Sequence, residues 1–270
     1  MIAAAEEMKD RCMRRYTVEN SGFLDMRQQS LIMEKCRADR DILMTEYRDG
    51  AGYDRPAPGD GFIRGFFYGG YEDAERRILI FMSEYDDIDE VISGDGCPLA
   101  LLRVCTGGGN GKKLTHRDYL GSLLALGIKR EKTGDILVRD DGADIVILKE
   151  LGEYLLANYN RAGRTELSVS LEDISCIKPG SVHVTEKRDT VASLRLDSLT
   201  ASAFGVSRAK AQEKIRAGLV FINGAEAGKP DIKVCEGDKI VMRGSGKAVL
   251  REISGKSRKD RICVIIDKYE

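Results

Sequence analysis

The side chains best suited to bind a ligand are basic and lie in the C-terminal third of the sequence. Ser207 and Arg208 begin a predicted helix, RAKAQEKIRA, in which Lys210 and Lys214 share one face because they are four residues apart. The free N–H groups and the dipole at the start of a helix favour a phosphate. This pattern predicts a surface that grips a nucleic-acid backbone rather than reading bases. The alternative for Lys210 and Lys214 is ordinary solvated charge.

The sequence predicts no metal centre and no cofactor. It has an odd number of cysteines, no CxxC pair, and only His116 and His183 as further zinc ligands, so no cluster with the spacing of a zinc site is present. Free thiols in a reducing compartment are the simpler interpretation. The seven cysteines are Cys12, Cys36, Cys97, Cys105, Cys176, Cys235 and Cys263.

Three further motifs suggest catalysis, but none has the residues that its chemistry requires. His116-Arg117-Asp118 matches the kinase HRD, but no DFG and no paired lysine accompany it. The glycine-rich run 107–113 ends in GKK without the GxxxxGK[ST] spacing of a nucleotide-binding loop. The acidic run 86–90 is better explained as a solvated loop. We therefore expect no catalytic residues, no enzymatic activity and no small-molecule substrate.

Charge is divided unequally along the 270 residues. Residues 180–270 carry 18 Lys and Arg against 12 Asp and Glu, a net charge of +6, whereas residues 1–179 carry 25 against 32, a net charge of −7. This division predicts a module that binds polyanions on a body that does not bind them indiscriminately. Apolar runs are too short to cross a membrane, and the N-terminus is unlike a signal peptide, so we expect a cytoplasmic protein with no membrane partner.

The predicted elements give an α+β protein with three parts. Residues 1–58 should be an N-terminal helical segment that ends in the breaker run GAGYDRPAPGDG. Residues 59–178 should form a central domain in which residues 100–174 follow the order β-α-β-β-α-β, with a hairpin turn near Asp141-Gly142. That order is ferredoxin-like and is shared by RNA-recognition-motif domains. However, the strand Asp144–Leu148 lacks the aromatic residues that stack on bases, so contact with RNA, contact with protein and a scaffold role all stay open.

Residues 180–270 should form a compact third part. Two short helices, 193–205 and 208–217, are followed by the strand LVFING, whose Asn223-Gly224 predicts a tight turn. The segment 233–244 predicts a further strand pair with Gly237-Asp238 at its turn. Two last strands, 247–254 and 260–269, should flank a basic loop.

The linked motifs of this part resemble the S4 (alpha-L) RNA-binding domain. They are Arg195-Leu196-Asp197, then Ser207-Arg208, then IRAGLVFING at 215–224, then Gly237-Asp238-Lys239-Ile240. The resemblance implies binding to RNA through its basic side chains. The candidate RNA-binding residues are Arg195, Ser207, Arg208, Lys210, Lys214, Arg216 and Lys229, with Lys256, Arg258 and Lys259 in the basic loop.

Three other segments extend the resemblance over essentially the whole chain. FLDMRQQ at 23–29, GGYEDAERRILIF at 69–81 and HRDYLGSLLALGIKREKTGDI at 116–136 resemble the bacterial YlmH-like proteins, which are encoded beside cell-division genes. The resemblance implies a non-catalytic protein that binds structured RNA (rRNA and tRNA) on the large ribosomal subunit during ribosome-associated quality control. A candidate second RNA surface comprises His116, Arg117, Lys129 and Arg130.

Two other function classes are consistent with the sequence. An RNA-modifying enzyme could use the S4 domain as its RNA handle, and would need a catalytic constellation in the central domain. A cell-division interaction protein is suggested only by gene neighbourhood. Sedimentation with ribosomes would separate the ribosomal factor from the cell-division protein.

Overall fold

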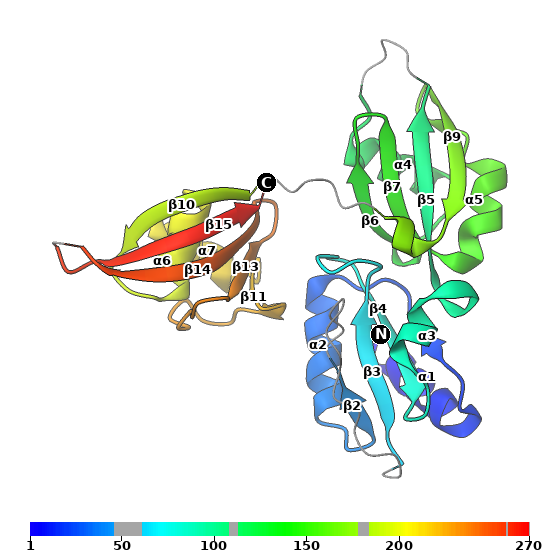
Figure 1. Ribbon diagram of the computed structural model, residues 1–270, viewed down its shortest axis with the longest axis horizontal. Helices are drawn as coiled ribbons and strands as arrows, with labels where there is room; N and C mark the ends of the chain where they lie inside the picture. The colour runs from blue at the N-terminus through cyan, green and yellow to red at the C-terminus, as the bar shows by residue number, and fades with distance from the viewer. Residues whose placement is uncertain (46–60, 108–112, 178–183, 258, 270) are drawn as a thin grey trace. The chain divides into compact units, whose positions relative to one another are not determined.

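The computed structural model describes residues 1–45, 61–107, 113–177, 184–257 and 259–269. The chain divides into two compact units, Met1–Gly180 and Ser181–Glu270, and each is described by itself. The architecture is mixed α+β with three principal sheets (Figure 1). Within the described ranges, no helix is both long enough and apolar enough to cross a membrane.

The first layer of the N-terminal unit is a four-stranded sheet in the order β1-β4-β3-β2. Helices α1 (Ile2–Arg15) and α2 (Met26–Arg37) pack on it through a core that includes Cys12, Ile32 and Phe81. Asp25 begins α2 with a reciprocal capping box to Gln28. The strands are β1 (Glu19–Asn20), β2 (Ile42–Met44), β3 (Ile63–Tyr68) and β4 (Ile78–Ser83).

This pairing corrects the predicted helical segment 1–58. Strand β2 pairs in parallel with β3 from Ile42↔Ile63, and β1 pairs with β4 from Glu19↔Phe81, so strands from both sides of the breaker run share one sheet. Residues 1–44 are therefore part of a mixed layer with residues 63–83. The breaker run itself lies almost entirely outside the described residues.

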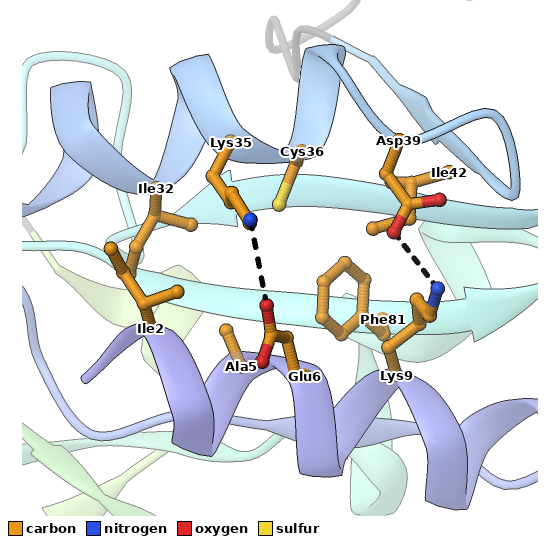
Figure 2. A pocket seen from close by; sticks show the side chains of 10 residues that line it. All are labelled: Ile2, Ala5, Glu6, Lys9, Ile32, Lys35, Cys36, Asp39, Ile42 and Phe81. Carbon is orange, nitrogen blue, oxygen red and sulfur yellow. Dashed lines mark hydrogen bonds and ion pairs between the residues drawn. The ribbon is translucent and has the colours of Figure 1, made fainter.

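Helices α1 and α2 enclose a small cavity of about 30 Å³ above Phe81 and Cys36 (Figure 2). Two ion pairs cross its opening, Lys9–Asp39 at 2.8 Å and Lys35–Glu6 at 3.7 Å. A volume of this size holds about one water molecule. The cavity is therefore small, and Ile42 and Phe81 line it together with the two helices.

The second sheet of this unit has the order β6-β7-β5-β9-β8. Its elements follow the predicted β-α-β-β-α-β order, with the short strand β8 added before the last strand. Thr115 caps α4, and the hairpin turns between Val138 and Ala143, which face each other. The elements are β5 (Leu99–Thr106), α4 (His116–Ala125), β6 (Thr133–Val138), β7 (Gly142–Leu148), α5 (Gly152–Asn158), β8 (Arg161–Ala162) and β9 (Thr165–Glu172).

Strand β7 is buried along its whole length, because other parts of the unit cover both faces of the sheet at this strand. Its Ile145 and Ile147 pack toward α4 and α5, in one core with Tyr119. Its Val146 and Leu148 belong to a different core, shared with the first layer and with α3 (Ile88–Ile92). This explains why β7 is apolar and carries no exposed aromatic residue. Short 3₁₀ turns lie at Gly94–Gly96, Arg130–Lys132, Lys149–Leu151 and Ile174–Cys176.

The C-terminal unit is a six-stranded sheet in the order β10-β15-β14-β13-β11-β12, with α6 and α7 together on one face (Figure 1). Its own core contains Leu196, Ile215, Val220 and Ile240. The elements are β10 (Val184–Val191), α6 (Leu196–Phe204), α7 (Arg208–Arg216), β11 (Val220–Ile222), β12 (Ala225–Glu226), β13 (Lys239–Met242), β14 (Gly246–Lys256) and β15 (Ile262–Tyr269).

Turn chemistry in this unit follows the sequence, with one correction. Gly218 ends α7 at φ 67°, and Asn223 and Gly224 have φ of 49° and 82°, the paired positive values of a type I′ hairpin turn. The predicted strand pair at 233–244 is wrong. Only β13 forms there, and it pairs with β11 and β14, while Lys233 makes an isolated bridge to Arg195.

Candidate nucleic-acid interface

The carboxylate of Asp197 holds two of the predicted RNA-binding arginines together. It lies in the first turn of α6 and is fully buried. Arg208 binds it with both arms of its guanidinium, Nε to Oδ2 at 3.0 Å and Nη2 to Oδ1 at 3.2 Å. Arg195 approaches at 3.3 and 3.4 Å, and Gln212 Nε2 donates to Oδ2 at 2.7 Å. A carboxylate with this many donors fixes the orientation of both arginines.

The two arginines are fixed but not buried. The side chains of Arg195 and Arg208 are 42% and 49% exposed, whereas that of Asp197 is 0% exposed. Two cations surround one anion, so the cluster keeps a net positive charge on the solvent side. Burial alone would raise the pKa of Asp197, but hydrogen bonds from Arg208, Gln212 and Arg195 outweigh it and lower that pKa to about 2. The carboxylate is therefore ionised at neutral pH.

The N-terminus of α7 offers further hydrogen-bond donors, because Arg208 is the first residue of this helix. Ser207 caps the helix, its hydroxyl accepting from the N–H of Lys210 at 3.2 Å. The first N–H groups of a helix have no partner within it, so those of Arg208 and Ala209 can donate to an anion. By contrast, the carbonyls of Ile232 and Pro230 accept from the first two N–H groups of α6, so α6 offers no such donors.

Other predicted residues of this helix contribute less. Lys210 pairs with Glu213 at 3.0 Å, which offsets its charge. Lys214 is half-buried and Arg216 is exposed, both in the last turn of α7. The sequence favoured Lys210 and Lys214 as an i, i+4 pair, but it did not show that a glutamate three residues after Lys210 would bind it.

The remaining predicted contacts of this unit lie on loops. Lys229 is exposed after β12. In the basic loop, Lys256 pairs with Asp260 at 2.7 Å and Lys259 is exposed, while Arg258 lies outside the described residues. The neighbouring Arg261 donates its Nε to the hydroxyl of Thr190 at 3.1 Å, which ties this loop to β10.

Within the candidate second surface, the structure places His116 near Arg130. His116 and Arg117 are exposed in the first turn of α4, and Lys129 is exposed just before the 3₁₀ turn. Burial and the nearby Arg130 cation lower the pKa of His116. Arg130 itself is partly buried. Its Nη1 donates to Thr133 O at 2.7 Å, to Thr133 Oγ1 at 3.0 Å and to Gly134 O at 3.0 Å.

No other chemistry is concentrated in the described part of the chain. Among those residues, no group of three or more His, Cys, Asp or Glu side chains could hold a metal ion. The cysteines there are unpaired with one another, and burial raises the pKa of Cys12 and of Cys36 to about 11. Cys176 and Cys235 are exposed. The glycine-rich run lies mostly outside the described residues, and so does His183.

Models of known families match a segment of the N-terminal unit and a segment of the C-terminal unit. A family model described as "Putative RNA-binding domain in YlmH" matches residues 110–177, and the S4 domain model matches residues 194–240. The chain therefore carries a YlmH-type RNA-binding domain and an S4 domain. The S4 match spans Asp197, Arg208 and Gln212, and the YlmH match spans His116 and Arg130.

Two known proteins are similar to this chain. It is 29% identical over 272 residues to the ribosome-associated protein quality control protein P2 of Bacillus subtilis (strain 168), covering all of this chain and 94% of that protein. It also matches the solved structure of cell division protein ylmH from Streptococcus pneumoniae at 17% identity and a TM-score of 0.45, over 63% of this chain and 88% of that one.

The sequence alone did not reveal the residues that organise the arginine pair. Asp197 was recognised as part of the RLD motif, but its role as the shared partner of two arginines was not inferred. Gln212 was read only as a helix residue. A signal was present, since Arg208 and Gln212 are four residues apart and share one face of α7, so both can reach a single acceptor on the facing helix.

Proposed function

We propose that this protein is a non-catalytic RNA-binding factor that grips structured rRNA or tRNA through its S4 domain. Its site of action would be the large ribosomal subunit carrying a tRNA, during ribosome-associated quality control. The observation that carries the proposal is the pair Arg195 and Arg208, oriented by the buried Asp197 within a domain that matches the S4 family. A fixed pair of guanidiniums suits the regular phosphate geometry of folded RNA.

The central sheet supports the same function in a different way. Its strand order β6-β7-β5-β9 is that of a ferredoxin-like domain such as an RNA-recognition motif, and we propose that this domain makes a second contact through His116, Arg117, Lys129 and Arg130. On the sheet face opposite α4 and α5, Arg103 and Arg139 bind the buried Asp144. Since β7 offers no exposed aromatic residue, unpaired bases have no stacking platform on this strand.

Two contacts of modest strength combine through effective concentration when one chain carries both. The ribosomal setting rests on the relative in Bacillus subtilis, whose name places it in ribosome-associated quality control. On this proposal the protein needs no cofactor and no metal, and its partners are structured RNA and the large subunit.

The test is a competition at a stated, near-physiological salt concentration, because affinities for nucleic acid depend steeply on salt. Labelled full-length protein is offered purified large subunits with and without tRNA, against an excess of unstructured RNA. We expect binding to the subunits, with preference for those that carry tRNA. Preference for the unstructured RNA would contradict the proposal, whereas equal affinity for empty and tRNA-bearing subunits would remove the tRNA from it.

A further inference from the structure

Three segments that are far apart in the sequence meet around Thr133 in the N-terminal unit. Arg76, which follows strand β3 in the GGYEDAERR run, donates its Nε to Thr133 O at 3.2 Å and its Nη2 to Phe23 O at 2.9 Å. Arg130 donates its Nη1 to the same Thr133 O at 2.7 Å. These segments are the ones on which the YlmH resemblance rests, so the family's motifs converge at one place.

The geometry sets two guanidinium groups side by side. Because Arg76 and Arg130 share one carbonyl oxygen, their donor nitrogens are closer together than the sum of the two bond lengths. The acceptors of both guanidiniums are neutral carbonyl and hydroxyl oxygens, and within the described residues neither guanidinium has a carboxylate within ion-pair distance. The nearby Asp135 accepts from the hydroxyl of Tyr71 at 2.9 Å and from the backbone N–H groups of Glu75 at 2.7 Å and of Arg76 at 3.1 Å, and it makes no ion pair with either guanidinium.

Both guanidiniums keep donors that reach solvent. Three nitrogens make no hydrogen bond to the described protein residues: Arg76 Nη1, Arg130 Nε and Arg130 Nη2. None of the three is fully buried, so each retains some contact with solvent. Burial and, next, the neighbouring Arg76 lower the pKa of Arg130 to about 10, so it stays charged at neutral pH beside a second cation. Two anchored cations that keep accessible donors and lack an ion-pair partner have the chemistry of a phosphate site.

We propose that Arg76 and Arg130 together bind one backbone phosphate of the RNA, and that this paired site is the centre of the second RNA contact. The inference rests on the proposed function and deepens it. It adds Arg76, from the first layer of the unit, to a surface otherwise drawn from the central domain. Exposed Arg117 and Lys129 extend the positive charge beyond a single phosphate, which favours a polyanion over a small anion.

The direct test measures binding on the wild-type full chain and uses variants only to assign signals. The arginine Nε–Hε signals are followed by NMR during titration with inorganic phosphate, and separately with a folded RNA hairpin that the protein binds. Signals are assigned by their loss in R76Q and R130Q. We expect saturable shifts of Arg76 and Arg130 with both probes. Arg139, whose Nε is held by Asp141 at 3.0 Å, is the internal control that stays in place.

Each outcome decides between the two proposals. If the hairpin shifts Arg195 and Arg208 but not Arg76 and Arg130, the inference is overturned and the proposed function stands. Shifts with phosphate alone would overturn the assignment to RNA. If none of the four arginines responds to the hairpin, the proposed function fails as well.

A binding measurement then gives the size of the contact. R130Q should lower affinity for the hairpin by roughly 3- to 10-fold and reduce the salt dependence by the contribution of about one phosphate. The matched control R164Q removes an exposed arginine from the β8–β9 turn of the same unit and should leave both unchanged. An R130Q variant that remains folded and binds as the wild type does would overturn the proposal.

Discussion

Asp197 puts a negative charge in the middle of a surface whose proposed ligand is also negative. On charge alone, this carboxylate should weaken the binding of an anionic ligand. Its hydrogen bonds give the reason for its presence, since it orients Arg195, Arg208 and Gln212 at once. An exposed arginine loses side-chain freedom when it binds a phosphate, and an arginine that is already held by a carboxylate loses less.

Replacing Asp197 by asparagine should therefore weaken RNA binding although it makes the domain more positive. We expect a several-fold loss of affinity and a loss of about 1–3 kcal/mol in the free energy of unfolding of the C-terminal unit, because charged hydrogen bonds are replaced. Asp231→Asn, which removes an exposed carboxylate from the same unit, is the matched control. Tighter binding by D197N would show that charge, not orientation, governs this surface.

The same carboxylate should make the C-terminal unit sensitive to acid. The pKa of Asp197 is lowered to about 2 in the folded state, against about 4 for an unfolded aspartate. A lowered pKa contributes stability that is complete above the unfolded value and is lost as the pH falls toward the folded value. Denaturant titration measures the free energy of unfolding at each pH. Between pH 5 and pH 2 this free energy should fall more steeply for the wild-type protein than for D197N, and parallel curves would contradict this.

Replacing Arg208 by glutamate should weaken RNA binding without unfolding the unit. The arginine side chain is about half exposed, so its loss removes a phosphate contact and should flatten the dependence of affinity on salt. The variant does place two carboxylates together, so circular dichroism must accompany the binding curve. Equal affinity and equal salt slope in a folded variant would make Arg208 a bystander.

At the scale of elements, the central sheet shows which strands and helices the sequence pattern can predict. The hairpin of β6 and β7, the capped helix α4 and the strand β5 were all predicted, because their periodicity and turn residues are local properties. Strands β1 and β2 were missed, since two or three residues are too few to show alternation. The strand pair predicted at 233–244 failed because β13 takes its partners from β11 and β14.

The candidate site was predictable only in part for a related reason. The motif marked Arg195 and Arg208, but their common partner is a contact between two helices, which spacing along the chain does not reveal. Likewise Arg130 was recognised as basic, whereas its neighbour Arg76 comes from a segment 54 residues away.

Two glycines in the central domain should respond oppositely to the same substitution. A Cβ on Gly142 would lie 1.9 Å from the carbonyl oxygen of Val104 on the adjacent strand, so Gly142→Ala must disturb the pairing of β5 with β7. Gly121 is exposed within α4 with open space around it, and Gly121→Ala should stabilise the unit by up to about 1 kcal/mol. Thermal denaturation of both variants checks this, and a Gly142→Ala protein as stable as the wild type would contradict the close approach.

At the scale of the whole molecule, the net charge and the hydrophobic cores divide at the same boundary, the one between the two units. Each hydrophobic core lies within one unit, so the unit that carries +6 does not need the unit that carries −7 in order to bury its apolar residues. Besides its proposed direct contact, the acidic unit can then act on RNA binding through its electrostatic field. A field of this kind disfavours indiscriminate contact and is screened by salt.

Residues 181–270 expressed alone should fold, and at low salt they should bind unstructured RNA more tightly than the full chain does. The difference should shrink as the ionic strength rises, because the Debye length falls from about 10 Å at 0.1 M to about 3 Å at 1 M. Fluorescence anisotropy over a salt series measures it, with circular dichroism to confirm the fold. Equal affinities at low salt would show that the acidic unit has no repulsive role.

The burial of the cysteines gives this chain a natural pair of attachment points. Thiol reagents attack the thiolate, so Cys12 and Cys36, with pKa values raised to about 11 by burial, react slowly at neutral pH. Cys105 and Cys263 are half-buried, whereas Cys176 and Cys235 are exposed, and one of these two belongs to each unit. Brief maleimide treatment of the unmodified protein should therefore favour one dye on each unit. Energy transfer between the dyes would report how the distance between the two units changes when RNA binds.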